Sequence, residues 1–171
     1  YLSWLAALLA VEMLSWLSYV QPTWRAPFCV LVMVVVLVLS CIKLQFGIAA
    51  LLAELVIGSQ GYVLALSVGS FAVSLRLGVF AVVMLAWLVD CLRQRQVRFF
   101  QSFYWKWYMA LVAFLGIGVL TGYWHGNSLK NIFFDWNGYL YIGMVLPFTQ
   151  AITSRDQIKR LLPIFYAGIT V

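Results

Sequence analysis

VLVMVVVLVL (residues 30–39) is a run of ten apolar residues without a polar break. Strands of a transmembrane barrel alternate polar and apolar residues with a period of two. This run does not alternate, so we exclude a transmembrane barrel. The apolar stretch also continues on both sides, from Phe28 to Ile42, and a membrane helix needs roughly 20 such residues. The run therefore predicts a helix in a membrane.

The composition of the whole chain supports the same conclusion. Of its 171 residues, 65% are hydrophobic and 9% are charged, whereas soluble domains carry about 25% charged residues. So few charges cannot cover a water-facing surface, and we predict an integral membrane protein. The formal net charge of +6 does not indicate a nucleic-acid partner in this setting, because lysine and arginine mark the cytoplasmic loops of membrane proteins.

We predict an all-α, polytopic transmembrane helical bundle with about six to seven membrane segments. Residues 1–171 form one bundle, and we expect it to be part of a longer protein, because both ends lie in apolar runs. Residues 58–76 contain Gly58, Gly61 and Gly69 and are too broken for a helix. The expected segments are 1–19, 28–42, one from about 46 that carries Glu54, 77–92, 107–123, 133–152 and one from 161.

The basic residues predict the orientation. They cluster in DCLRQRQVRFFQSFYWKW (90–107) and TSRDQIKR (153–160), which we place in the cytoplasm. If segments two and three form a hairpin, Lys43 joins them, and eight basic residues face the cytoplasm against three outside: Arg25, Arg76 and Lys130. One long tilted helix through Lys43 is the alternative. We expect the basic aromatic run to anchor on anionic membrane lipids rather than on RNA.

Signatures of soluble enzymes are missing from the sequence: there is no Walker A motif, HExxH or GxSxG. The single histidine, His125, excludes a site of several histidines, and we interpret it as a loop residue. Cys29, Cys41 and Cys91 have no metal-ligand spacing, and we interpret them as small apolar residues. We therefore predict no metal and no cofactor.

Two carboxylates, Glu12 and Glu54, fall inside apolar segments. Ionisable residues within a membrane are either functional or paired. We favour a packing role for both, with Glu54 near an arginine. The alternative is a transporter or channel fragment in which the two carboxylates line an ion or proton path. Asp90 and Asp156 lie beside basic loops and are expected to be ion-paired there.

The external ends of segments four and six carry the candidate substrate-binding residues Arg76, Asp135 and Asn137. Arg76 follows a glycine-rich stretch, and an arginine fork binds phosphate bidentately. Asp135 and Asn137 lie among aromatic residues, an arrangement that grips sugars. Together these residues suit a lipid-linked, phosphorylated glycan. Capping of segment six explains Asp135 equally well.

Several stretches resemble the amino-terminal half of bacterial O-antigen ligases and O-antigen polymerase-like membrane proteins. They are ELVIGSQGY (54–62), VSLRLGVF (73–80) and DWNGYLYIGMVLPF (135–148), in the family's order, and the likeness begins at VEMLSWLSY (11–19). It consists of hydropathy and a few polar landmarks.

The resemblance implies a lipopolysaccharide or polysaccharide glycosyltransferase of the bacterial inner membrane. Such enzymes move a glycan from undecaprenyl diphosphate to an acceptor on the periplasmic face, without metal or nucleotide sugar. The family's catalytic arginines and histidine lie in a large periplasmic loop of the carboxyl half, and none maps onto residues 1–171. A non-catalytic assembly subunit remains a further alternative.

Overall fold

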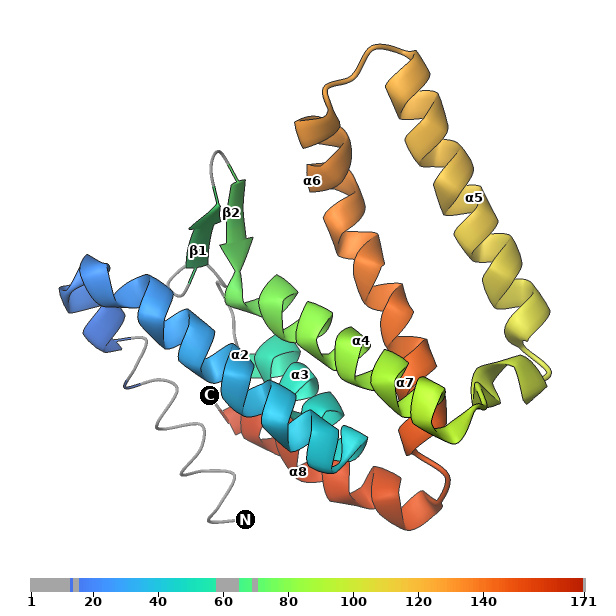
Figure 1. Ribbon diagram of the computed structural model, residues 1–171, viewed down its shortest axis with the longest axis horizontal. Coiled ribbons are helices and arrows are strands. Elements are labelled where there is room, and N and C mark those ends of the chain that lie inside the picture. The colour runs from blue at the N-terminus through green and yellow to red at the C-terminus, as the bar shows by residue number, and fades with distance from the viewer. Residues whose placement is uncertain (1–12, 14–15, 58–64, 69–70, 171) are drawn as a thin grey trace.

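The computed structural model describes residues 13, 16–57, 65–68 and 71–170, which hold seven α helices and one two-stranded hairpin (Figure 1). The predicted helical architecture is confirmed for this part of the chain. The helices are α2 (Arg25–Ile42), α3 (Leu44–Ile57), α4 (Leu75–Gln94), α5 (Trp105–Trp124), α6 (Leu129–Leu140), α7 (Val145–Ala151) and α8 (Arg155–Thr170). Short 3₁₀ turns, η1 (Pro22–Trp24), η2 (Arg98–Gln101) and η3 (Tyr141–Met144), precede α2, α5 and α7.

Three stretches of the described chain are long and apolar enough to cross a membrane: Pro22–Ile42, Leu75–Gln94 and Trp105–Trp124. They match predicted segments two, four and five. The 14 residues of α3 rise only about 21 Å, less than the roughly 30 Å of a hydrocarbon core. None of the residues of α5 is buried, as expected of a helix that faces lipid or another protein segment. Most of predicted segment one lies outside the described residues.

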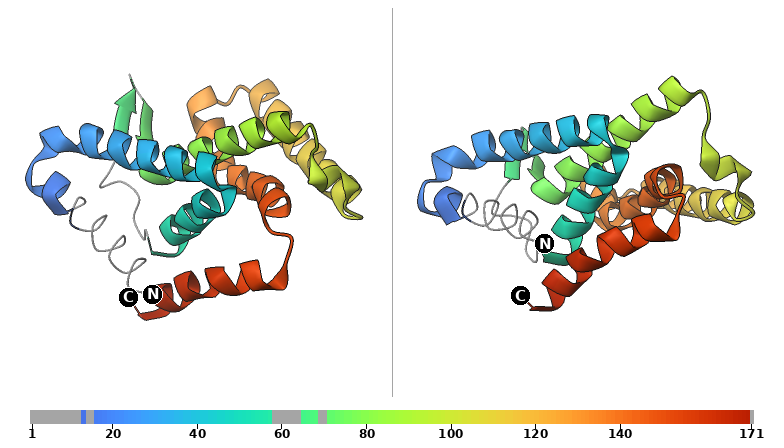
Figure 2. Two further views of the ribbon diagram at one scale, coloured as in Figure 1. Left: turned by 60° about the horizontal axis from the view of Figure 1, so that its bottom comes forward. Right: turned by 90° about the horizontal axis from the view of Figure 1, so that it is seen from below.

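A single residue separates α2 from α3. Lys43 has an extended backbone, with φ −149° and ψ 119°, and it ends α2. The two helices then pack against each other, and both pack against α4 (Figure 2). The predicted hairpin is therefore present, and the alternative of one continuous helix through Lys43 is wrong.

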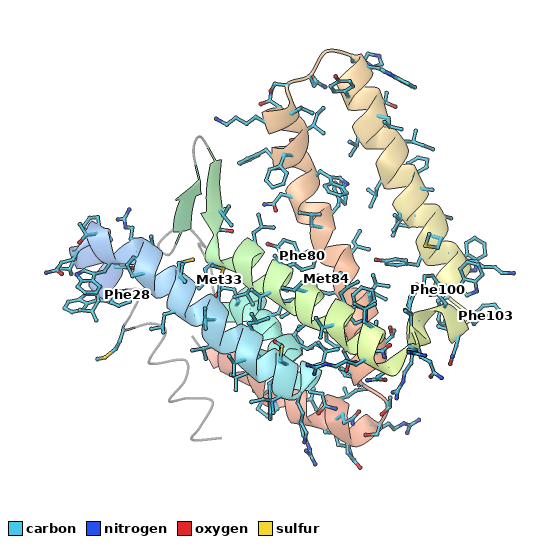
Figure 3. The ribbon with its side chains drawn as sticks, in the orientation of Figure 1. Phe28, Met33, Phe80, Met84, Phe100 and Phe103 are labelled. Atoms are coloured by element: carbon cyan, nitrogen blue, oxygen red, sulfur yellow. The ribbon has the colours of Figure 1, made fainter. Side chains whose placement is uncertain are left out.

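Close approach of the helix backbones forms the core. A Cβ on Gly47 of α3 would lie 3.2 Å from Val83 Cγ2 of α4 and would meet the hydroxyl of Ser40 in α2. Gly78 of α4 lies in the same way against the Met33 thioether of α2 (Figure 3). Small residues of this kind let membrane helices pack tightly. The fully buried side chains Cys29, Ile48, Leu51 and Val83 lie in this core.

Predicted segment six is an interrupted helix that starts earlier than expected. Ser128 caps α6 by accepting a hydrogen bond from the Asn131 N–H at 3.3 Å, so the interpretation of Asp135 as the cap is wrong. The helical path tightens at η3 and continues as α7. Pro147 has no N–H to bond to the Gly143 carbonyl, which explains this irregularity.

Two further differences concern segments that we expected to be loops. Within 58–76, β1 (Ala65–Val68) and β2 (Phe71–Ser74) pair antiparallel, with Ala65 opposite Ser74 and Val68 opposite Phe71. Gly58, Gly61 and Gly69 lie outside the described residues. The last helix begins at Arg155 rather than Leu161, so part of the expected basic loop forms the first turns of α8.

Both basic loops and Lys43 gather at one end of the molecule. Gln45, two residues after Lys43, donates from Nε2 to the Ala151 carbonyl at 3.1 Å. Gln150 accepts from the Arg98 N–H at 3.0 Å and donates to the Gln96 carbonyl. This grouping is the one that the predicted topology requires.

Candidate functional site

Arg76 lies in the first turn of α4, directly after the β hairpin. Ser74 caps the helix, and its Oγ accepts from the Leu77 N–H at 3.4 Å. The arginine side chain is half-buried, and its Nε is shielded from solvent. The helix dipole adds partial positive charge at the same position. A guanidinium there attracts an anion more strongly than one on an open surface.

Tyr141 lies beside this helix end. Its ring meets the ring of Phe80 edge to face, with centroids 5.3 Å apart. Phe80 lies one turn after Arg76 on α4 and is labelled in Figure 3. The charges of Arg76 and Glu54 both act electrostatically on the Tyr141 hydroxyl. The structure thus brings groups from α3, α4 and η3 into one neighbourhood.

The structure separates the two residues that we predicted together on segment six. Asn137 is half-buried, and its Oδ1 is buried and accepts no hydrogen bond from any described residue. Asp135 is exposed. Residues two apart in a helix point about 200° apart, so the pair does not share a face. Asn137 instead lies one turn before Tyr141.

Three other titratable residues singled out in the sequence lie at the end of α5, on α3 and outside the described residues. His125 caps the end of α5 in an exposed loop, and its Nδ1 lies 2.8 Å from the Thr121 carbonyl, in agreement with the loop interpretation. Glu54 is half-buried in α3, where its charge also acts on the Cys29 thiol. Glu12 lies outside the described residues.

The comparisons with known proteins do not add a relative. The chain matches no family model, no curated protein and no solved structure. Its function must therefore be argued from its own residues, their positions and their chemistry.

A cavity that the sequence did not predict lies at the basic end. It has a volume of about 550 Å³, is open to the outside and is lined by the ends of α2, α3 and α4 and by the 151–160 region. Lys43, Arg93 and Arg160 line it, together with Asp90 and Asp156. Neither Arg76 nor Glu54 lines this cavity, so it is distinct from the region around Tyr141. Its basic residues were visible in the sequence, but only as separate loop charges.

Proposed function

We propose that the chain is a multi-pass protein of the bacterial inner membrane and part of a glycosyltransferase of the O-antigen ligase or polymerase type. The enzyme transfers a glycan from an undecaprenyl-diphosphate carrier to an acceptor on the periplasmic face. The observation that carries the proposal is the position of Arg76, at the positive end of α4 with Nε shielded and Tyr141 beside it. The resemblance in residues 54–80 and 135–148 supplies the reaction.

The chemistry that Arg76 provides is electrostatic. Breaking the bond between the sugar and the carrier leaves negative charge on the departing diphosphate. A preorganised guanidinium in a partly desolvated place stabilises that charge, and this kind of stabilisation is worth about a hundredfold or more in rate per donor. The positive helix end acts in the same direction. No metal is required in this scheme.

The aromatic and amide groups serve the glycan. Asn137 has a buried oxygen that accepts no hydrogen bond from the described residues, and a sugar hydroxyl would satisfy it. The rings of Phe80 and Tyr141 offer an apolar surface for a sugar or for the first isoprene unit. In the proposal Asp135, which is exposed on another face of α6, contacts glycan hydroxyls from the open side.

The test is glycan transfer in membranes that carry the full protein. Arg76→Ala should lower the transfer rate about a hundredfold, and Arg76→Lys should retain part of it, because lysine keeps the charge but loses the bidentate fork. Lys130→Ala is the matched control, since it removes one exposed positive charge from the same predicted face. Equal transfer by wild type and Arg76→Ala, at equal amounts of folded protein, would refute the assignment.

A further inference from the structure

The cavity at the basic end combines the size and the charge of a ligand site. Its volume of about 550 Å³ falls within the roughly 300–1,000 Å³ of small-molecule pockets. It lies at the carboxyl-terminal ends of α2 and α4, two of the helices that are long enough to cross a membrane. Groups at such helix ends meet the headgroup layer of a bilayer.

The three cations of the cavity have no ionic partner within the described part of the chain. Lys43, Arg93 and Arg160 are exposed, and none of them forms an ion pair or a side-chain hydrogen bond there. They come from the α2–α3 junction, the end of α4 and the second turn of α8. Packing has thus brought three positive charges from distant parts of the chain to one cavity.

Of the two carboxylates of the cavity, Asp156 has an ionic partner within the described residues and Asp90 does not, although we expected both to be ion-paired. Asp90 accepts a hydrogen bond from Gln94 Nε2 at 2.8 Å. Asp156 lies 3.6 Å from Lys159 Nζ, as expected of a carboxylate beside a basic loop. The lining therefore has three cations and one carboxylate without an ionic partner within the described residues, so the local net charge is positive and favours an anionic ligand.

Apolar residues complete the lining: Ile42, Leu44, Ala86, Val89 and Ala151. Ser40 and Gln45 are already engaged, since Ser40 Oγ donates to the Val36 carbonyl and Gln45 Nε2 to the Ala151 carbonyl. A ligand that combines a phosphate with an apolar part fits both kinds of wall. An acidic phospholipid of the adjacent leaflet has this composition.

We infer that this cavity binds a phosphate-bearing anion through Lys43, Arg93 and Arg160, with the headgroup of an acidic phospholipid as its source. The inference does not depend on the glycosyltransferase proposal, because it concerns the opposite end of α4 and none of the residues placed near Arg76. Bound lipid would tie the α2–α3 junction, α4 and α8 together.

The experiment measures lipid binding to the full protein in neutral detergent by native mass spectrometry. The probe is phosphatidylglycerol, compared with phosphatidylcholine and with soluble glycerol phosphate. Each basic residue near a membrane surface contributes about 1 kcal/mol toward an anionic lipid, so Arg93→Gln/Arg160→Gln should weaken phosphatidylglycerol binding about thirtyfold. The control Arg95→Gln/Arg155→Gln removes the same charge from the same end but from residues that do not line the cavity.

The outcomes separate the sources of the anion. Loss of phosphatidylglycerol binding in the cavity variant alone supports the lipid site, and displacement of the lipid by glycerol phosphate identifies a soluble phosphate as the ligand. Equal loss in both variants, or equal binding of phosphatidylcholine, overturns the inference. Lys43→Gln is a second variant, at an exposed position, for use if the double variant does not fold.

Discussion

Gln150 accepts a hydrogen bond from the backbone N–H of Arg98 at 3.0 Å, across 52 positions of the chain. The amide is 4% exposed, and its Nε2 donates to Gln94 Oε1 and to the Gln96 carbonyl, each at 3.3 Å. One side chain of α7 thus satisfies one group at the end of α4, on Gln94, and two in the segment that follows, on Gln96 and Arg98. This contact fixes the basic segment against the helix ends that surround the cavity.

Replacement of Gln150 should therefore destabilise this end of the molecule. Gln150→Leu keeps a similar volume but leaves the Arg98 N–H and the Gln96 carbonyl without their partner. A buried polar group that loses its partner destabilises a protein by about 1–3 kcal/mol. We expect a lower Tm in detergent for this variant. Gln101→Leu is the control, because Gln101 is exposed and its side chain makes no hydrogen bond to any residue that the structure describes. An equal loss in both variants would contradict the role of Gln150.

The sequence predicts the positions of the long helices because their signal is local. Apolar runs that end at charged or proline-containing stretches gave α2, α4 and α5 to within three residues at each end. Lys43 could be placed in a turn because a charge between two short apolar runs is expensive inside a bilayer. The basic residues of 90–107 and 153–160 could be grouped on one side of the membrane, because positive charges concentrate in cytoplasmic loops.

Local signals that were present in the sequence account for two of the differences. Gly69 and Ser70 separate two runs rich in β-branched and apolar residues, a spacing typical of a hairpin. Ser128 precedes the helical pattern of α6 and is a standard capping residue. The opposite faces of Asp135 and Asn137 follow from the rotation of about 100° per residue once both lie in one helix, so this separation could also have been predicted.

The cavity is a different case, because its signal is not local. Its cations come from positions 43, 93 and 160, and each alone resembles an ordinary loop charge. Only the packing of α3 against α8 and of α2 against α4 brings them together. The charge bias of the sequence places all three on one side of the membrane, but it does not say which of these helix ends are neighbours there.

The close contact at Gly47 yields a second prediction. A methyl group there would meet Ser40, whose Cβ would lie 2.9 Å away, and Val83 on the third helix. Overfilling a packed core destabilises by about 1–3 kcal/mol, so Gly47→Ala should lower the Tm. Gly118→Ala in α5 is the matched control, because nothing lies within 4 Å of the added methyl and alanine favours a helix. Adding Ser40→Gly should restore the Tm of Gly47→Ala, because it removes the side chain that the new methyl group meets. An unchanged Tm in Gly47→Ala, together with no gain from Ser40→Gly, would contradict the tight packing.

The predicted orientation can be tested with single cysteines. In a full protein whose native cysteines have been replaced, Gln96→Cys reports on the basic end and Asn127→Cys on the loop between α5 and α6. Eight basic residues on the first side and three on the second favour a cytoplasmic position for residue 96. A membrane-impermeant maleimide added to intact cells whose outer membrane is permeabilised should label Asn127→Cys but not Gln96→Cys.

Both of these positions are exposed, so a difference in labelling reports the side of the membrane rather than burial. Lysed membranes provide the control, because there the two cysteines should react at similar rates. Labelling of Gln96→Cys in intact cells would show that the protein has the opposite orientation in the membrane. Arg76 would then face the cytoplasm, where no periplasmic glycan transfer takes place, whereas the cavity lined by Lys43, Arg93 and Arg160 would keep its charge and open to the outer leaflet. The labelling result therefore decides the glycosyltransferase proposal, and the lipid-binding measurement remains an independent test of the cavity.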